Sequence, residues 1–214
     1  MIRCRATYAK KEELRYTSNL DMQKIWERYL RRAKLPLAYS QGFHPQPRIH
    51  QAAPLPLGLL SYQEIVDFWL HLEENQLLEI IAALTVNVQP GISITSIESI
   101  PSNSPAIQTL VRSSDYCAVA LNNPINEELT HQVERINSAS SLPRVRRNKP
   151  YDLRPLIQNL HFDVPIADLP PTIQMRLSSM DGATGRVDEV IFEMGMEPAD
   201  FRITRTALII DDLT

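Results

Sequence analysis

The sequence has little of what metal and redox sites require. Its 214 residues include only two cysteines, Cys4 and Cys117, which lie far apart in strand-like runs. Two reduced and buried thiols are the expected state of such a pair, with one disulfide as the alternative. No CxxC or HxxxH spacing occurs, and the acidic residues form no recognisable metal-binding group. We therefore expect neither a metal ion nor a cofactor.

Long apolar runs are also missing. The longest, such as LLEIIAAL at residues 77–84, are far too short to span a bilayer. The N-terminal residues MIRCRATYAKK lack the apolar core and small-residue cleavage site of a secretory signal. The expectation is a cytoplasmic protein without a membrane segment.

Catalytic signatures are absent as well. There is no nucleophile elbow and no zinc-site spacing. The turn DGATGRVDE at residues 181–189 puts two glycines before a predicted helix, where a phosphate can bind, but it lacks the Lys-Ser/Thr of a P-loop. A simple turn with a helix cap is the favoured interpretation. His44 and His50 are weak candidates for a general acid or base. The other histidines stand alone and are interpreted as structural or surface residues: His71, His131 and His161.

Charge is low in total but uneven along the chain. The net charge is −3, yet residues 1–50 carry +7 and residues 101–150 carry +2. Residues 51–100 and 151–214 carry −6 each. Because surface potential follows local charge, the mild total is compatible with a strongly basic surface.

The first hundred residues predict a strand, helix, strand, strand, helix, strand order. Strands are expected at residues 2–10, 48–55, 61–72 and 92–100, and helices at 17–34 and 74–84. Ser18 with Asp21 is typical of a capping-box start. The first helix buries a face of apolar residues at helical spacing: Leu20, Met22, Ile25, Trp26, Tyr29, Leu30 and Ala33.

The second half repeats this order less clearly after a polar connector at residues 101–113. Strands are expected at 115–122, 172–179 and 201–210, helices at 126–139 and 184–196, and a strand with an irregular hairpin at 142–164. The predicted fold class is α+β, with two tandem ferredoxin-like (βαββαβ) units whose antiparallel sheets carry helices on one face. The predicted domains are residues 1–100 and 114–214.

The stretch LAYSQGFHPQPRIHQAAPLPLG at residues 37–58 is a stiff, polar loop directly behind the first helix. Prolines restrict it, Gly42 permits close backbone approach, and Phe43 offers a stacking face, although Phe43 in a packed core is the alternative. Such a loop suits a phosphate-bearing ligand with stackable bases. Its candidate ligand-binding residues are Arg28, Arg31, Arg32, Ser40, Gly42, Phe43, His44 and Arg48.

A second basic cluster, PRVRRNKPYDLRP, spans residues 143–155. In a strand, Arg144 and Arg146 share one face and Arg147 takes the other. Basic groups interleaved with an aromatic suit a nucleic-acid backbone and one stacked base, and a flexible basic hairpin is the alternative. Asp152 is expected to position the turn. The candidate binding residues here are Arg144, Arg146, Arg147, Lys149, Tyr151 and Arg154.

The run YTSNLDMQKIWERYLRRAKLPLAYSQGFHPQPRI, with PLPLGLLSYQEIVD, YDLRPLI and RITRTAL, resembles the bacterial radical-SAM-linked domain of unknown function. Members of that family occur alone or fused behind a B12-binding radical SAM protein. The resemblance therefore implies a separate B12-binding radical SAM partner, and the absence of CxxxCxxC from this chain implies that any radical chemistry belongs to that partner. The expected layout is also similar to that of the CRISPR repeat-processing endoribonucleases, a likeness of fold alone.

These observations favour an RNA-binding accessory protein of a radical SAM enzyme that presents tRNA or ribosomal RNA for modification. In this interpretation the chain is not catalytic on its own, and phosphate contacts position the RNA while Phe43 or Tyr151 stacks on a base. Two alternatives stay open. One is a metal-independent RNA-processing enzyme that uses His44, and the other is a protein-interaction module that docks a partner through its acidic blocks at residues 61–100 and 181–212.

Overall fold

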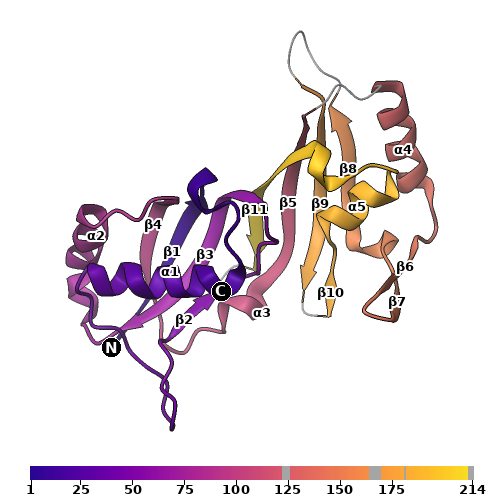
Figure 1. The fold of residues 1–214 in the computed structure, drawn as a ribbon. Helices are drawn as coiled ribbons and strands as arrows, with labels where there is room; N and C mark the ends of the chain where they lie inside the picture. The colour runs from indigo at the N-terminus through magenta and orange to yellow at the C-terminus, as the bar shows by residue number, and fades with distance from the viewer. Residues whose placement is uncertain (122–125, 164–169, 181, 212–214) are drawn as a thin grey trace. The chain divides into compact units, whose positions relative to one another are not determined.

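The computed structural model describes residues 1–121, 126–163, 170–180 and 182–211 (Figure 1). The chain divides into two compact units. Unit 1 comprises Met1–Val111 together with Asp211, and unit 2 comprises Arg112–Ile210. The protein is a mixed α+β protein with largely antiparallel strand pairing. Among the described residues, no helix is both long and apolar enough to cross a membrane.

Unit 1 is built on a sheet with the spatial order β2–β3–β1–β4, in which each neighbouring pair is antiparallel. Both longer helices pack on one face of this sheet, as Figure 1 shows. The strands are β1 (Ile2–Lys10), β2 (Ile49–Gln51), β3 (Leu60–Leu70) and β4 (Ile92–Ile100). The helices are η1 (Glu12–Leu14), α1 (Asn19–Arg32), η2 (Glu74–Gln76), α2 (Leu77–Val86) and α3 (Ile107–Leu110).

The core of unit 1 follows from two periodicities. Alternate residues of β1 and β3 point toward the helices, and the apolar stripe of α1 covers them. Trp26 lies at the centre, with its ring 5.0 Å from that of Tyr8 and 6.2 Å from that of Phe68. The predicted buried face of α1 was wrong at Leu20, which is 74% exposed although Met22, in the same turn of the helix, lies in the core.

The two cysteines differ in their surroundings. Both are free thiols. Cys4 is fully buried, and burial raises its pKa to about 12, so this thiol stays protonated. Cys117 is only half-buried, contrary to the prediction, because its side chain lies on the polar face of its strand beside Gln174.

The predicted cap of α1 is present. The Asp21 amide donates to the Ser18 hydroxyl at 3.2 Å, and that hydroxyl donates to the Asp21 carboxylate at 2.7 Å. The hydrogen bond from Ser18 lowers the pKa of Asp21. Ser18 therefore satisfies one of the free amides at the start of the helix.

Replacing Ser18 by alanine is expected to destabilise unit 1 by about 1 kcal/mol, because the capped amide loses its partner. Both tryptophans of the chain, Trp26 and Trp69, belong to unit 1, so tryptophan fluorescence during urea unfolding reports this unit. Ser102→Ala, at an exposed position outside any helix, is the control. An unchanged unfolding midpoint for Ser18→Ala would contradict a stabilising cap.

Unit 2 places β5 between β9 and β11, and β8 and β10 pair with the other edge of β9. Its strands are β5 (Val111–Ala120), β6 (Pro143–Arg146), β7 (Lys149–Asp152), β8 (Ile157–Asp163), β9 (Thr172–Met180), β10 (Ala183–Thr184) and β11 (Phe201–Ile210). Its helices are α4 (Asn126–Ser138), η3 (Arg154–Leu156), α5 (Val187–Glu193) and η4 (Pro198–Asp200).

Several boundaries in this half differ from the prediction. The connector contains α3, whose buried Ile107 and Leu110 anchor it, and β5 begins at Val111 rather than at residue 115. The helix expected at 184–196 is shorter, because β10 extends the β9 hairpin through Thr184. Gly182 therefore lies in a strand-to-strand turn, with φ of +72°, and does not cap a helix.

Candidate nucleic-acid interface

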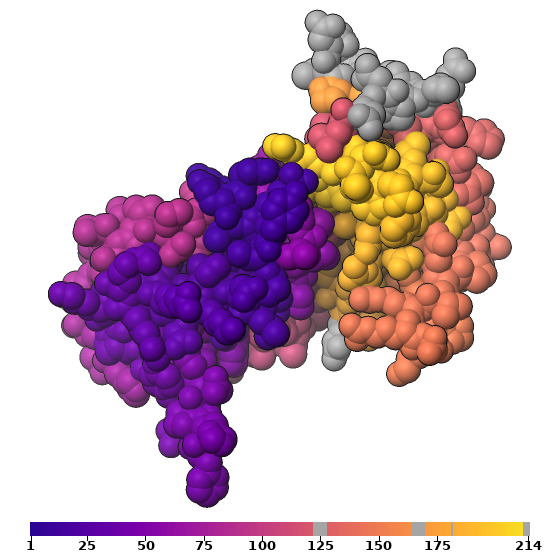
Figure 2. Space-filling model, in the orientation of Figure 1, coloured from indigo at the N-terminus to yellow at the C-terminus, as the bar shows by residue number. Residues whose placement is uncertain are grey.

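The loop between α1 and β2 forms a narrow projection, which we call the finger (residues 39–47). Tyr39 and Pro47 pair across its base. The Ser40 amide donates to the Gln46 carbonyl at 2.8 Å, and the Gln46 amide donates to the Ser40 hydroxyl at 2.9 Å. These bonds hold the two arms of the loop together, and Figure 2 shows the finger standing out from unit 1 in purple.

The outer part of the finger is exposed throughout. Residues 40–46 are all exposed, and Phe43, in the middle of the loop, has a relative exposure of 102%. Of the two alternatives for Phe43, the structure therefore excludes the packed core. Gly42 precedes it with φ of +131°, a conformation that favours glycine. His44, the weak catalytic candidate, is exposed beside it.

Arg31 braces the base of the finger. Its Nη2 donates to the Tyr39 hydroxyl at 2.6 Å and lies 2.7 Å from a carboxylate oxygen of Glu27, one turn earlier on α1. The hydrogen bond that Arg31 donates to Tyr39, followed by the charge of Glu27, raises the pKa of Arg31. Arg31 thus joins the helix to the finger.

The three arginines of α1 do not form one free cationic face. Arg32 donates to the Asn87 carbonyl at 3.3 Å and to the Gln89 side-chain oxygen at 3.0 Å, so it holds α1 against the end of α2. Arg28 is exposed. Arg31 and Arg32 therefore use their guanidinium groups for contacts within unit 1, and Arg28 is the exposed arginine of this trio left as a candidate for phosphate binding.

Arg48 lies at the root of the finger, over an aromatic ring. Its Cζ is 4.5 Å from the ring centroid of Trp69, and Cζ of Arg3 is 5.1 Å from the same ring. His50 meets that ring edge-on at 4.9 Å. Desolvation, followed by the charge of Arg48, lowers the pKa of His50, so this imidazole is neutral at pH 7.

Behind this group lies a buried ionic cluster that sequence reasoning missed. Asp67 has 0% exposure and accepts hydrogen bonds from Arg3, at 2.6 Å to Nη2, and from Arg5, at 2.8 Å to Nε. Arg3 also donates to the backbone carbonyls of Ser104 and Pro105, each at 2.7 Å. The available signal was the alternation of β1, which places both arginines on the face opposite its apolar residues.

The second predicted cluster is a two-stranded hairpin, β6–β7, whose turn is basic. Arg146 pairs with Lys149 in the ladder, and Arg147 and Asn148 form the turn with φ of +49° and +61°. Two residues with positive φ match the turn type that suits the twist of short hairpins. Arg147 is therefore a turn residue, and the prediction that it takes the other face of a strand was wrong. All four of these residues are exposed.

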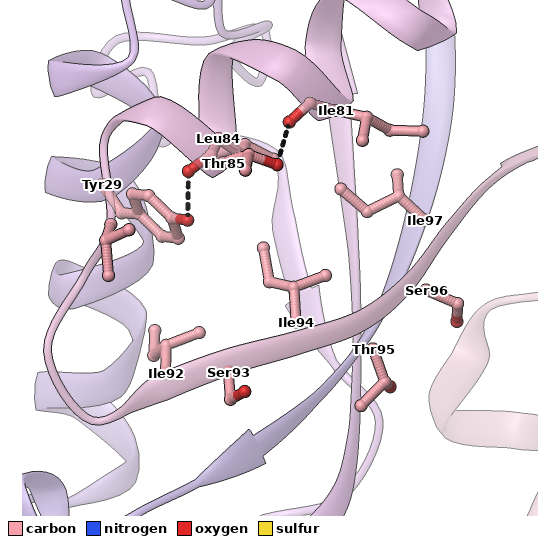
Figure 3. A pocket seen from close by; sticks show the side chains of 11 residues that line it. Tyr29, Ile81, Leu84, Thr85, Ile92, Ser93, Ile94, Thr95, Ser96 and Ile97 are labelled. Carbon is pink, nitrogen blue, oxygen red and sulfur yellow. Dashed lines mark hydrogen bonds between the residues drawn. The ribbon is translucent and has the colours of Figure 1, made fainter.

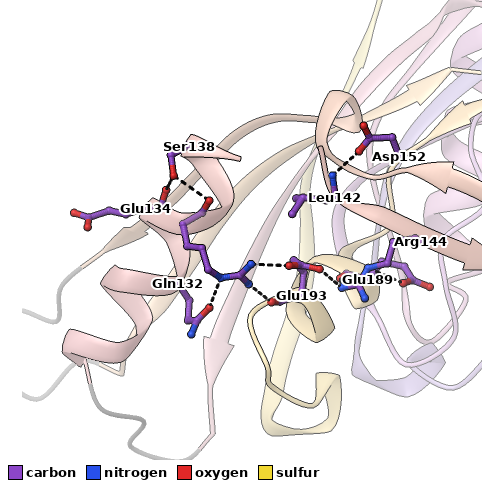
Figure 4. Close-up of polar contacts among 9 residues, drawn as sticks. Gln132, Glu134, Ser138, Leu142, Arg144, Asp152, Glu189 and Glu193 are labelled. Carbon is purple, nitrogen blue, oxygen red and sulfur yellow. Dashed lines mark hydrogen bonds and ion pairs between the residues drawn. The ribbon is translucent and has the colours of Figure 1, made fainter. Parts of the chain in front are cut away.

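The arginines nearer the base of this hairpin make internal contacts, of which Figure 4 shows those of Arg144. Arg144 lies 2.6 Å from a carboxylate oxygen of Glu193, and Arg135 lies 2.8 Å from the same carboxylate. Arg154 donates to the carbonyls of Ile157 and Asn137, at 2.8 and 3.2 Å. Arg144 and Arg154 thus hold unit 2 together, while the hairpin turn stays exposed.

Asp152 positions the chain as expected, but through backbone groups. It accepts from the amides of Leu142, at 2.7 Å, and Arg154, at 3.0 Å, and the bond from Leu142 is the main cause of its lowered pKa. Tyr151 is half-buried, and desolvation raises its pKa. Both residues line a pocket of about 370 Å³. The pocket also contains Arg146, Leu156, Gly182, Ala183, Thr184 and Arg186.

Unit 2 has a further pocket of about 280 Å³, lined mainly by polar side chains, which the sequence did not predict. Arg176 makes a bidentate pair with Asp115, at 2.6 and 2.8 Å, and His161 lies 3.6 Å from Asp163. Alternate outward positions of β5, β8 and β9 bring these groups together, although His161 was interpreted as an isolated residue. Among the described residues, no group of three or more His, Cys, Asp and Glu side chains is arranged to hold a metal ion.

Comparison with known proteins assigns the chain to a protein family. The profile of a family described as uncharacterized proteins conserved in bacteria (DUF2344) matches residues 3–187. A search of curated proteins found no match. Among solved structures, a chain in the crystal structure of a Cbf5–Nop10–Gar1 complex is similar, with a TM-score of 0.49 and 8% sequence identity. The similarity covers 97% of this chain and 50% of that chain, and it supports no functional inference.

Proposed function

We propose that this chain, which belongs to the DUF2344 family of uncharacterized proteins conserved in bacteria, is an RNA-binding protein. In this proposal it presents tRNA or ribosomal RNA to a separate B12-binding radical SAM protein and performs no chemistry itself. The observation that carries the proposal is the finger, which holds Phe43 in solvent on a hydrogen-bonded loop.

A fully exposed phenylalanine contributes nothing to the core of its own unit. Burying such a side chain typically stabilises a fold by roughly 1.5–3 kcal/mol, and the free protein gains none of this stabilisation from Phe43. The bonds of Ser40 and Gln46, and the brace from Arg31 to Tyr39, limit the freedom of the loop before any ligand arrives. A ring presented in this way suits stacking on an unpaired base, since single-stranded RNA is read largely through its unstacked bases.

Exposed and partly exposed cations provide the complementary phosphate contacts. In unit 1, Arg28 is exposed on α1, and Arg48 lies at the root of the finger. In unit 2, Arg146, Arg147 and Lys149 are clustered at the hairpin turn. Each unit therefore offers its own basic element, and such contacts position RNA without reading its sequence.

The proposal includes the finer fold, two ferredoxin-like units in tandem. Its support in unit 1 is the spatial order of strands, β2–β3–β1–β4, with α1 after the first strand and α2 after the third. In unit 2 the order β8–β9–β5–β11, with α4 after β5 and α5 after the β9–β10 hairpin, follows the same plan. The β6–β7 hairpin is then an insertion between α4 and β8.

The function is tested by recovering RNA crosslinked to the tagged protein in bacterial cells and measuring the affinity of that RNA at several salt concentrations. We expect binding that weakens steeply as salt rises, because phosphate contacts release counterions. Co-purification of a B12-binding radical SAM protein tests the second half of the proposal. The RNA-binding proposal would be overturned if no RNA binds at about 50 mM salt, or if the affinity does not change with salt concentration.

The contribution of the hairpin has its own prediction. The double variant Arg146→Gln/Lys149→Gln is expected to reduce the slope of log affinity against log salt by about 1.4, at roughly 0.7 for each phosphate contact with single-stranded RNA. Lys11→Gln/Lys34→Gln removes the same charge from exposed positions of unit 1 and serves as the control. Equal slopes for the two double variants would show that the hairpin makes no phosphate contact.

A further inference from the structure

Helix α2 is unusually apolar for a helix on the surface. Its sequence, LLEIIAALTV, contains one charged residue, Glu79. Ile80 and Leu84 fill the core of unit 1, whereas Ile81, on the side of the same helix that faces β4, is only partly buried. A helix that is apolar on all sides is normally buried on all sides, so this one has an apolar face without a cover in its own unit.

Between α2 and β4 runs a groove of about 390 Å³ (Figure 3). Its walls are aliphatic, with Ile81 and Leu84 from α2 facing Ile94 and Ile97 from β4, as the close-up shows. Tyr29 closes one end, where its hydroxyl donates to the Leu84 carbonyl at 2.8 Å. The groove therefore places an aliphatic lining beside the edge of strand β4.

That strand is the outermost of the sheet in unit 1. Among the described residues, β4 pairs with β1 on one side and with no strand on the other. Its sequence, ISITSIESI, contains neither lysine nor proline, the residues that commonly block exposed edges. Its free edge is consequently open to an added strand, the mode by which extended peptides bind beside a helix.

The charges near the groove indicate which charge a partner should carry. Residues 51–100 contain six carboxylates and no lysine or arginine. Glu73, Glu74 and Glu79 lie at the start of α2, and Glu74 accepts a hydrogen bond from Ser99 at the end of β4, at 2.7 Å. Carboxylates therefore lie just beyond the Ile97 end of the groove, on the side of Ser99, where they disfavour nucleic acid and favour a basic residue.

We propose that β4 and α2 form a docking groove for an extended partner peptide that has aliphatic side chains at alternate positions and a lysine or arginine at one end. The peptide adds a strand to β4, its aliphatic side chains enter the groove, and its basic end lies at the carboxylates. This site is separate from the finger and from the hairpin.

A second copy of this chain is a poorer occupant. Between β1 and β4 the register shifts at Thr95, which is an extra residue whose hydroxyl donates to the Thr7 carbonyl at 3.1 Å. The bulge adds local twist to this edge, which a flexible peptide can follow but a second β4, with the same bulge, cannot match along its length. The helix-facing side chains of a second β4 are also already packed on their own α2, so they are not available to fill the groove.

The test begins with selection of a random 12-residue peptide library displayed on phage against the full chain. We expect a consensus with aliphatic residues at every second position and a basic residue at one end. The winning peptide, labelled with fluorescein, is then measured by anisotropy against two matched variants. Thr85→Lys places a cation in the groove, and Val86→Lys places one on the neighbouring exposed position, which does not line it.

The expected result is at least a tenfold loss of peptide affinity for Thr85→Lys, and an unchanged affinity for Val86→Lys. Selection on Glu79→Lys is expected to remove the basic residue from the consensus. The proposal is overturned if no alternating aliphatic consensus emerges, or if both lysine variants bind equally. It is also overturned if sedimentation equilibrium shows a dimer that Thr85→Lys dissociates, because a second copy is then the occupant.

Discussion

Replacing Asp67 by asparagine is expected to lower the free energy of unfolding of unit 1 by about 3–5 kcal/mol. Asp67 is the carboxylate between two buried guanidinium groups, since Arg3 and Arg5 are only 2% and 3% exposed. The substitution keeps the shape of the side chain and removes its charge, so two cations stay buried with carbonyl and amide acceptors alone. Removing one partner of a buried ionic cluster typically has an effect of this size.

Urea unfolding followed by tryptophan fluorescence measures this loss, because Trp69 lies directly against Arg3. The matched control is Glu27→Gln, which breaks the Glu27–Arg31 pair of the same unit, where the two side chains are 25% and 57% exposed. An exposed pair of this kind contributes at most about 1 kcal/mol. If Asp67→Asn changes stability no more than the control does, the cluster is not an important part of the fold.

Replacing Phe43 by alanine is expected to weaken RNA binding by about 1–3 kcal/mol, which corresponds to roughly 5- to 150-fold, since one base loses its stacking partner. The side chain makes no contribution to the core, so the thermal stability of the variant should equal that of the parent. Phe43→Trp, which retains an aromatic face, should preserve most of the affinity. The measurement is a titration of the crosslinked RNA at fixed salt.

Tyr62→Ala is the control for this experiment, because Tyr62 is another exposed aromatic of unit 1, on β3 and outside the finger. Its affinity for RNA should stay at the parental value. If Phe43→Ala binds RNA as tightly as the parent, Phe43 does not stack on a base and the proposed function loses its main support. If both variants lose affinity equally, the stacking surface is not confined to the finger.

Local sequence patterns predicted most of the secondary structure. The strands β1, β4 and β11 have the expected bounds, and the Ser18 cap is present. These features depend on neighbours a few residues apart, through alternation, helical spacing and capping. The predictions that failed, at Leu20, Cys117 and Arg147, concern the exposure of single side chains and the position of a turn. The exposure of a side chain depends on which segments elsewhere in the chain pack against it.

Charge was the least predictable property. Residues 1–50 contain eleven lysines and arginines, and this excess favoured a basic surface with Arg28, Arg31, Arg32 and Arg48 as its candidate residues. Arg3, Arg5 and Lys10 are instead buried, and Arg31 and Arg32 serve contacts within unit 1. A count of charges along the chain cannot show this, because it contains no information about which carboxylates and carbonyls lie opposite each cation.

The sequence by itself determined the order of strands and helices, the cap of α1 and the stiffness of the finger, because proline, glycine and apolar spacing act over a few residues. Only the tertiary structure decided that Phe43 faces solvent and which arginines are exposed. It also revealed the groove between α2 and β4. The physical reason is distance along the chain: Asp67 lies 64 residues from Arg3, and only the pairing of β1 with β3 brings the two together.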